Sequence, residues 1–122
     1  MWERWNSYSS KHGFGDVGMN SFNHYAYGAI GEWMYTTVGG IDFAEPGFRK
    51  IRFAPVPGGD ITWARASLET RHGEAAIDWK KVGDKGGLEL HLVVPPNTTA
   101  ILELPGKEPV EFPAGTFEVR TK

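Results

Sequence analysis

Apolar residues recur at spacings of three and four between Ser21 and Val38, and this period predicts a helix of about four to five turns. They stand at Phe22, Tyr25, Ala26, Ala29, Ile30, Trp33, Met34, Tyr35 and Val38. Either Asn20 or Ser21 can cap the first turn, because each side chain can accept from an unpaired amide. The pair Gly39-Gly40 supplies the permissive backbone that ends helices. The start and stop signals therefore agree on one helix.

This helix is apolar almost all round, so we expect it to have neighbours on most sides. A second apolar stripe lies beside the first, at Tyr27, Ile30, Met34 and Val38. The remaining strip is small or polar, at His24, Gly28, Gly31 and Glu32. Its glycines would let another chain or a ligand approach closely. His24 can accept or donate a hydrogen bond, which suits a ligand hydroxyl.

Beyond Ile41 the pattern changes to short alternating runs punctuated by glycine and proline, which is typical of antiparallel sheets. The runs expected to form strands cover residues 50–55, 61–68, 75–82, 88–94, 100–104, 110–112 and 116–120. About seven strands at this spacing predict a mainly β fold, in which one N-terminal α-helix precedes an antiparallel β-sandwich of jelly-roll type. We therefore expect residues 1–40 to hold a loop and the helix, and residues 41–122 to form the sandwich domain.

Composition and charge exclude several classes of protein. With 122 residues the chain is long enough for one domain with its own core. Thirteen lysines and arginines against 15 aspartates and glutamates give a formal net charge of -2, so we expect no nucleic-acid and no membrane partner. The absence of cysteine excludes disulfides and thiolate metal sites. No apolar run approaches a membrane span and no signal peptide is recognisable, so we expect a soluble domain of unknown compartment.

Three motif-like features carry no function in our interpretation. Residues 13–18 match G-x-G-x-x-G, but a dinucleotide fingerprint needs a buried strand before it, and the preceding residues are polar. Asn97-Thr98-Thr99 fits a glycosylation sequon, but the two prolines before it favour a simple turn. The four histidines lack metal-ligand spacing, so neither a metal nor another cofactor is predicted.

Residues 1–18 show no clear period and are expected to form a loop, in which Glu3 stands between Trp2 and Trp5. A carboxylate in an apolar, partly desolvated setting could serve as a general base. On residue types alone a solvated surface glutamate is favoured, because charged residues are mostly exposed. A methionine directly before Trp-Glu-Arg-Trp suggests a piece cut from a longer protein, because natural N-termini are usually polar.

Several segments together closely resemble the C-terminal end of bacterial α-L-rhamnosidases of glycoside hydrolase family 78. They are W-E-R-W at 2–5, M-N-S-F-N-H-Y-A-Y-G at 19–28, G-E-W-M-Y at 31–35, and the runs 51–59 and 62–66. The likeness covers essentially the whole chain, and the N-S-F-N-H-Y-A-Y-G run is the specific part. The resemblance implies the last helix of a six-hairpin α-helical barrel followed by a C-terminal β-sandwich.

The resemblance also implies an activity, the inverting hydrolysis of L-rhamnose-containing glycosides. Glu3 resembles the general base of the family and His24 its substrate-binding histidine, with Trp2, Trp5 and Asn23 as supporting positions. An inverting glycosidase needs a second carboxylate roughly 6.5–9.5 Å from the first, to protonate the leaving oxygen. The acidic cluster that supplies it in the family has no counterpart in this chain. We therefore predict that the isolated chain has no glycosidase turnover.

Other interpretations of the chain's function and assembly remain alongside this one. Because the barrel helices it would face are missing, the helix over residues 21–38 is expected to drive self-association to a homo-oligomer, or else to fold down on its own sandwich. A carbohydrate-binding module is the main alternative, with Trp63 and Trp79 stacking on sugars. A purely structural accessory domain is the third.

Overall fold

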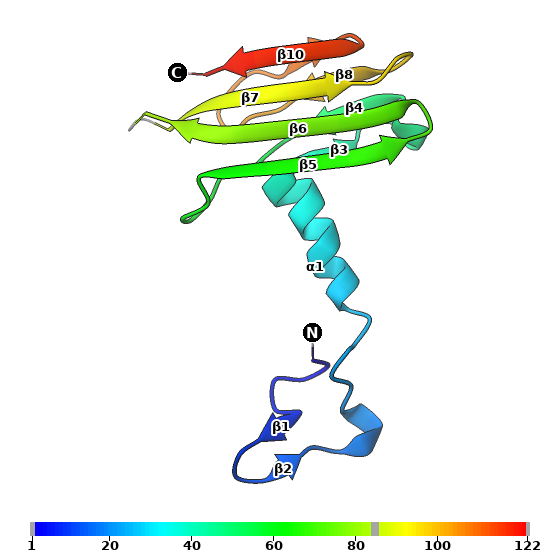
Figure 1. Cartoon of the computed structure of the whole chain (residues 1–122), viewed down its shortest axis with the longest axis vertical. Helices are drawn as coiled ribbons and strands as arrows, with labels where there is room; N and C mark the ends of the chain where they lie inside the picture. Colours follow the sequence, from blue (N-terminus) through cyan, green and yellow to red (C-terminus); the bar gives the residue numbers. More distant parts are fainter. Residues whose placement is uncertain (1, 84–85, 122) are drawn as a thin grey trace. The chain divides into compact units, whose positions relative to one another are not determined.

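The computed structural model describes residues 2–83 and 86–121, and the chain divides into two compact units, Met1–Trp33 and Met34–Lys122. The second unit contains two four-stranded sheets, drawn in Figure 1 as two layers of strands. One sheet has the order β10-β7-β6-β5 and is antiparallel throughout. Its strands are β5 (Trp63–Thr70), β6 (Gly73–Val82), β7 (Gly87–Val94) and β10 (Gly115–Arg120).

The other sheet has the order β3-β4-β8-β9. Its strands are β3 (Ile41–Phe43), β4 (Lys50–Phe53), β8 (Thr99–Leu102) and β9 (Val110–Phe112). Strands β4 and β8 pair in parallel, whereas the other two pairs are antiparallel. The chain leaves this sheet after β4, builds three strands of the opposite sheet and returns beside β4, and this route allows the parallel pairing. A short 3-10 helix, η3 (Pro46–Phe48), joins β3 to β4.

The predicted mainly β fold with antiparallel sheets is confirmed, and each predicted strand exists to within a few residues of its bounds. Strand β9 covers the predicted residues 110–112, and β7 differs from its predicted bounds by one residue. The sequence analysis did not predict β3 as a separate strand. The jelly-roll topology stays a prediction.

Alternation along each strand builds one core between the two sheets. In β7 the even positions from Leu88 to Val94 are buried, as their apolar character predicts, and the odd positions between them, 89, 91 and 93, are not. From the opposite sheet, Ile51 and Phe53 are fully buried against the same cluster. Burying a side chain of this size stabilises the fold by about 1.5–3 kcal/mol. The sandwich therefore derives its stability from its own residues.

The end of the helical segment lies in the sandwich unit. The π-helix η2 (Met34–Gly39) stops at the predicted glycine pair. A Cβ on Gly39 would lie 2.6 Å from the Cβ of Ala66, and Gly40 has a φ of +82° with Pro55 so close that a Cβ would lie 2.3 Å from its nitrogen. Both positions therefore require glycine, one for space and the other also for its backbone angle.

The first unit contains more structure than the predicted loop. Strands β1 (Tyr8–Ser9) and β2 (Gly13–Phe14) pair as a small antiparallel hairpin, and a 3-10 helix, η1 (Val17–Met19), follows. Helix α1 (Tyr27–Trp33) begins at Tyr27, so the predicted start at residues 20–21 is wrong. The backbone of Ser21 bonds to Glu3 instead of to a helical turn. A long-range contact of this kind overrides a local capping signal.

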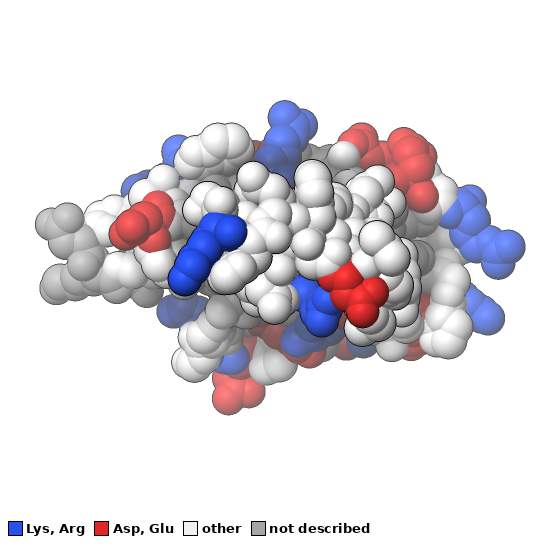
Figure 2. All heavy atoms as spheres, turned by 90° about the horizontal axis from the view of Figure 1, so that it is seen from below, with Lys and Arg blue, Asp and Glu red and all other residues white. Residues whose placement is uncertain are grey.

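Helix α1 contains no buried residue, and its apolar side chains lie open in this chain. Tyr27, Ile30 and Trp33 are each about half exposed. In the space-filling view of Figure 2, uncharged side chains occupy much of the visible surface, with charges of both signs interspersed among them. Within the described residues, no helix has the length and hydropathy needed to cross a bilayer.

Candidate functional site

Glu3 is fixed by two hydrogen bonds to one residue of the N-S-F-N-H run. Its carboxylate Oε2 accepts from the backbone amide of Ser21 at 3.0 Å. Its own amide donates to the carbonyl of Ser21 at 2.8 Å. Glu3 is half-buried, which is neither the open surface position nor the fully enclosed one considered from sequence. The amide of Ser21 therefore fixes one oxygen of the carboxylate.

Four aromatic rings of the first unit contact one another in a chain. The ring of Trp2 meets that of Phe22 edge to face, with centroids 5.0 Å apart. Phe22 in turn contacts Phe14 at 5.7 Å, and Phe14 contacts Tyr8 at 5.1 Å. Edge-to-face pairs of this kind are worth about 0.5–1.5 kcal/mol each beyond the area they bury. The rings therefore tie the N-terminal residues to the segment that follows η1.

Hydrogen bonds also connect the N-terminal residues to the segment around η1. Arg4 Nε donates to the carbonyl of Met19 at 3.0 Å. Ser7 is fully buried, its hydroxyl donates to the carbonyl of Arg4 at 2.8 Å, and its carbonyl accepts from the amide of Gly15 at 2.8 Å. Sequence reasoning missed Ser7, because a serine in an aperiodic segment carries no burial signal. Together these bonds fix the backbone around Arg4 and Ser7.

His24 caps the entry to helix α1 with its side chain. Its Nδ1 accepts from the amide of Ala26 at 3.3 Å, and its carbonyl accepts from the amide of Tyr27. Its ring also lies 4.4 Å from that of Tyr25, measured between centroids. When Nδ1 of a neutral imidazole accepts, Nε2 carries the proton and can donate to a ligand oxygen. The histidine is half-buried.

The structure connects some of the predicted site residues and leaves others apart. Trp2 and Glu3 both contact the Ser21–Phe22 pair that leads to His24. Trp5 is fully exposed and Asn23 is exposed, and within residues 2–83 and 86–121 neither side chain makes a hydrogen bond, ion pair or ring contact. The supporting roles of Trp5 and Asn23 remain predictions.

The first unit holds three acidic residues, Glu3, Asp16 and Glu32. The Asp16 side chain accepts from the amide of Gly18 at 2.8 Å and caps η1, which is a structural use of that carboxylate. Across the described part of the chain, no group of three histidine, aspartate or glutamate side chains is arranged to hold a metal ion. The segment thus offers a carboxylate held by the Ser21 amide and, three residues further along the chain, a hydrogen-bonding histidine.

The alternative prediction from sequence was a carbohydrate-binding surface with Trp63 and Trp79, and these two tryptophans differ in exposure. Trp79 is 2% exposed, and its indole Nε1 donates to the carbonyl of Val38 at 2.9 Å. Its predicted role in stacking on sugars is therefore wrong, because it belongs to the core. Trp63 is 67% exposed on the outer face of sheet β10-β7-β6-β5. Strand alternation predicts this difference, since Trp79 lies on the same face of β6 as the buried Ile77, and Trp63 lies on the same face of β5 as Arg65.

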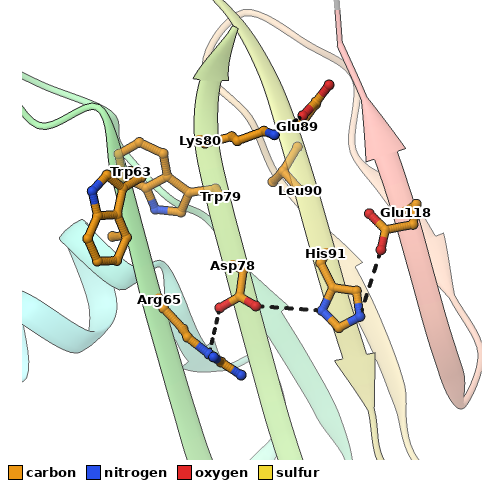
Figure 3. A pocket seen from close by; sticks show the side chains of 10 residues that line it. Trp63, Arg65, Asp78, Trp79, Lys80, Glu89, Leu90, His91 and Glu118 are labelled. Atoms are coloured by element: carbon orange, nitrogen blue, oxygen red, sulfur yellow. Dashed lines mark ion pairs between the residues drawn. The ribbon is translucent and has the colours of Figure 1, made fainter.

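A shallow concavity of about 390 Å³ lies on that outer face (Figure 3). Trp63 forms one part of its lining, and the rest comes from charged and polar residues of β5, β6, β7 and β10 together with Ala64, Trp79 and Leu90. The hydrogen bond from Lys80 is the main factor that lowers the pKa of the Glu89 carboxyl, with the charges of Lys80 and Arg120 adding to the effect. Sequence reasoning missed this cluster because strand pairing, which is not visible in the sequence, brings its members together.

Comparison with known proteins identifies the family. Residues 40–116 match the family model described as the bacterial alpha-L-rhamnosidase C-terminal domain, and residues 1–38 match the bacterial alpha-L-rhamnosidase 6 hairpin glycosidase domain. An alpha-L-rhamnosidase of Formosa agariphila is 51% identical over 105 residues, which cover 86% of this chain and 11% of the relative. One of Streptomyces avermitilis is 45% identical over 119 residues, covering 96% of this chain and 11% of the relative.

Solved structures agree with these matches. The crystal structure of native α-L-rhamnosidase from Aspergillus terreus matches all of this chain with a TM-score of 0.89 at 40% identity, over 14% of its own length. That of the Streptomyces avermitilis enzyme complexed with L-rhamnose matches all of this chain with a TM-score of 0.84 at 36% identity, again over 14%. The chain thus spans about a tenth of the curated relatives that it matches. The resemblance seen in the sequence is confirmed, and the chain belongs to the bacterial α-L-rhamnosidase C-terminal domain family.

Proposed function

We propose that this chain supplies the general base and a substrate-binding histidine to an inverting α-L-rhamnosidase that acts on L-rhamnose-containing glycosides. The observation that carries the proposal is the Glu3 carboxylate, held through Oε2 by the amide of Ser21 in the run that continues to His24. We assign residues 1–40 to the barrel end of such an enzyme and residues 41–122 to its sandwich domain. The similarity to α-L-rhamnosidases along the whole chain supports this assignment.

In this mechanism Glu3 acts on water. Its carboxylate takes a proton from a water molecule, whose oxygen attacks the anomeric carbon from the face opposite the leaving group. The glycosidic bond breaks, and a second acid protonates the departing oxygen, so the product sugar has inverted configuration. His24 Nε2 donates to a rhamnose hydroxyl and holds the ring in place. Trp2 and Trp5 provide apolar surface near it, and Asn23 provides a further polar contact.

This chain does not contain a matched second acid, so it has no turnover by itself. The test incubates the purified chain with an aryl rhamnoside and measures the release of rhamnose. We expect none above the uncatalysed rate. Release by the wild-type chain that is lost in Glu3→Gln would show that the chain holds a complete site and would overturn this part of the proposal.

A chimera tests the role of Glu3 directly. The matching part of the Streptomyces avermitilis α-L-rhamnosidase, 11% of that protein, is replaced by this chain. We expect an active chimera, in which Glu3→Gln lowers kcat by about 100- to 10,000-fold with little change in KM, because general base catalysis contributes that much. Asp16→Asn is the matched control, since it also neutralises a carboxylate of the first unit. An active chimera that tolerates Glu3→Gln would refute the assignment.

For His24 we expect that the isolated chain binds L-rhamnose through this residue without hydrolysing a glycoside. Calorimetric titration of the 122-residue chain with L-rhamnose should detect weak binding, which His24→Ala abolishes and Glu3→Gln reduces less. His24→Gln is the conservative comparison, because its amide can still donate to a hydroxyl. Binding of equal strength in His24→Ala would remove the histidine from the site.

We also propose that the apolar side chains of α1 drive self-association into a homo-oligomer when the chain is alone, as expected from sequence for the helix over residues 21–38. Ile30 and Trp33 are about half exposed, and apolar surface left open in this way favours association. Light scattering over a concentration series should show a mass above 13.5 kDa that falls toward this value in Ile30→Glu. A monomeric wild-type chain at high concentration would leave a purely structural accessory domain as the simpler description.

A further inference from the structure

An exposed tryptophan lies on the outer face of sheet β10-β7-β6-β5. Trp63 is 67% exposed at the start of β5, and it shares its side of the strand with Arg65. Tryptophan is highly buried on average, because its indole offers the largest apolar area of any side chain. The core residues of β5 lie on the opposite side, with Ala66 buried. Trp63 therefore contributes nothing to the core that its own strand builds.

Strand register places a row of four polar side chains next to it. Arg65 pairs with Asp78, Asp78 with His91, and His91 with Glu118, each on the neighbouring strand. Arg65 Nε lies 3.0 Å from Asp78 Oδ1, and the two ring nitrogens of His91 lie 3.8 Å from Asp78 Oδ2 and from Glu118 Oε1. Figure 3 shows this row crossing the four strands beside the indole.

A second row continues from Trp63 itself. Trp63 pairs with Lys80, Lys80 with Glu89, and Glu89 with Arg120. Lys80 Nζ lies 2.6 Å from Glu89 Oε2, and Arg120 Nη2 lies 3.3 Å from Glu89 Oε1. Both rows therefore hold their polar groups in position before any ligand arrives, and this lowers the entropy cost of binding.

The charges of the two rows cancel. They comprise three basic side chains, Arg65, Lys80 and Arg120, and three acidic ones, Asp78, Glu89 and Glu118. A phosphate, a sulfate or a nucleic acid would need an excess of positive charge, which this face lacks. The charge balance instead suits a neutral ligand with many hydrogen-bonding groups. The concavity of about 390 Å³ lies in the range of about 300–1,000 Å³ that is usual for small-molecule sites.

We propose that this face binds a neutral saccharide, with one sugar ring stacked on the indole of Trp63. The C–H face of a pyranose is apolar and packs on an aromatic ring, while its hydroxyls both donate and accept. Asp78 accepts from them, and Arg65 donates to them. His91 does either, according to its tautomer. Every residue named lies in Met34–Lys122, so the proposal does not rest on the role of Glu3.

The simpler interpretation of the two rows is cross-strand stabilisation of the sheet. Exposed opposite-charge pairs add about 0.2–1 kcal/mol each in antiparallel sheets, and the rows would do so without any ligand. That interpretation explains the ion pairs and leaves Trp63 without a role. An indole kept in solvent at the end of a charge-balanced concavity is the observation that favours a sugar.

The test titrates the full chain with a panel of neutral sugars, L-rhamnose, D-glucose, D-galactose, maltose and cellobiose, and with D-glucuronate as a charged comparator. The readout is the indole N–H resonance of Trp63, assigned in a nitrogen-15 spectrum by its loss in Trp63→Ala. We expect saturable shifts with at least one neutral sugar, at least 10-fold weaker binding in Trp63→Ala as measured by calorimetry, and recovery in Trp63→Tyr. Asp78→Asn should weaken binding several-fold.

Two controls separate this face from the rest of the chain. Phe43→Ala removes a comparably exposed aromatic side chain from the other sheet and should leave the affinity unchanged. His24→Ala distinguishes the two sites, because binding at the proposed rhamnose site responds to His24→Ala and not to Trp63→Ala, whereas binding on this face responds to Trp63→Ala. Circular dichroism confirms that each variant is folded. Binding that survives Trp63→Ala, shifts with D-glucuronate alone, or the absence of any saturable shift at millimolar sugar would each overturn the proposal.

Discussion

The two units of this chain differ in how far each buries its own apolar residues. In Met34–Lys122 a continuous cluster that includes Ile51, Phe53 and Leu92 is removed from water. In Met1–Trp33, among the described residues, only Ser7 is buried. Large side chains there are exposed, including Trp2, Trp5, Tyr8, Phe14, Val17, Met19, Tyr25, Tyr27, Ile30 and Trp33.

The sandwich unit thus has an apolar core of its own, and the described residues of the first unit do not form one. Burial of apolar surface is the main favourable term in folding, and the sandwich has it while the first unit does not. The first unit instead relies on a few ring contacts and on the hydrogen bonds that connect Glu3 and Arg4 to Ser21 and Met19. Residues 1–38, which contain this unit, match the barrel-domain model of the family.

The largest expected effect tests the core of the sandwich. Phe53→Ala removes a fully buried ring and should lower the free energy of unfolding by about 3–5 kcal/mol. Trp5→Ala removes a larger ring from the first unit and should change it by less than about 0.5 kcal/mol, because that side chain is fully exposed. Urea denaturation followed by far-ultraviolet circular dichroism measures both. Equal losses in the two variants would contradict the contrast between the units.

Two glycine substitutions compare the same two units, with smaller expected changes in stability. Gly40→Ala forces a side chain into a φ of +82° and against Pro55, so it should destabilise the chain by more than about 1 kcal/mol. Gly31→Ala, in helix α1 with nothing within 4 Å of the new Cβ, should stabilise that helix by about 0.5–1 kcal/mol. Thermal unfolding and helical ellipticity report the two effects. A stabilising Gly40→Ala would mean that the helix end is not packed as described.

The smallest effect concerns pH on the outer face of the sandwich. The pKa of Glu89 is lowered from its ordinary value of 4.5, first by the hydrogen bond from Lys80. A carboxyl with a lowered folded-state pKa contributes stability above its unfolded pKa and loses it as the pH falls through the folded value. The difference in urea midpoint between wild type and Glu89→Gln should therefore shrink from about pH 6 to about pH 3. Lys80→Met should remove most of that difference, and a pH-independent difference would disprove the linkage.

The fold of the sandwich was largely predictable from alternation. Side chains of a strand point to opposite faces in turn, so an apolar run at even positions from Leu88 to Val94 already indicates which face is buried. The glycine pair that ends the helical segment was also visible, because few residues other than glycine accept such positions. The specific N-S-F-N-H-Y-A-Y-G run pointed to the family before any contact was known.

Tertiary structure decided the features that depend on partners distant in sequence. The start of α1 was one such feature. The backbone amide of Ser21 donates to the Glu3 carboxylate, 18 residues away, and a local hydrophobic period cannot predict a contact of this length. The parallel pairing of β4 with β8 was another, since alternation says nothing about the direction of a neighbouring strand. The polar rows beside Trp63 were a third. A sequence specifies the face on which each side chain lies, and only the register of the assembled sheet determines which side chains become neighbours.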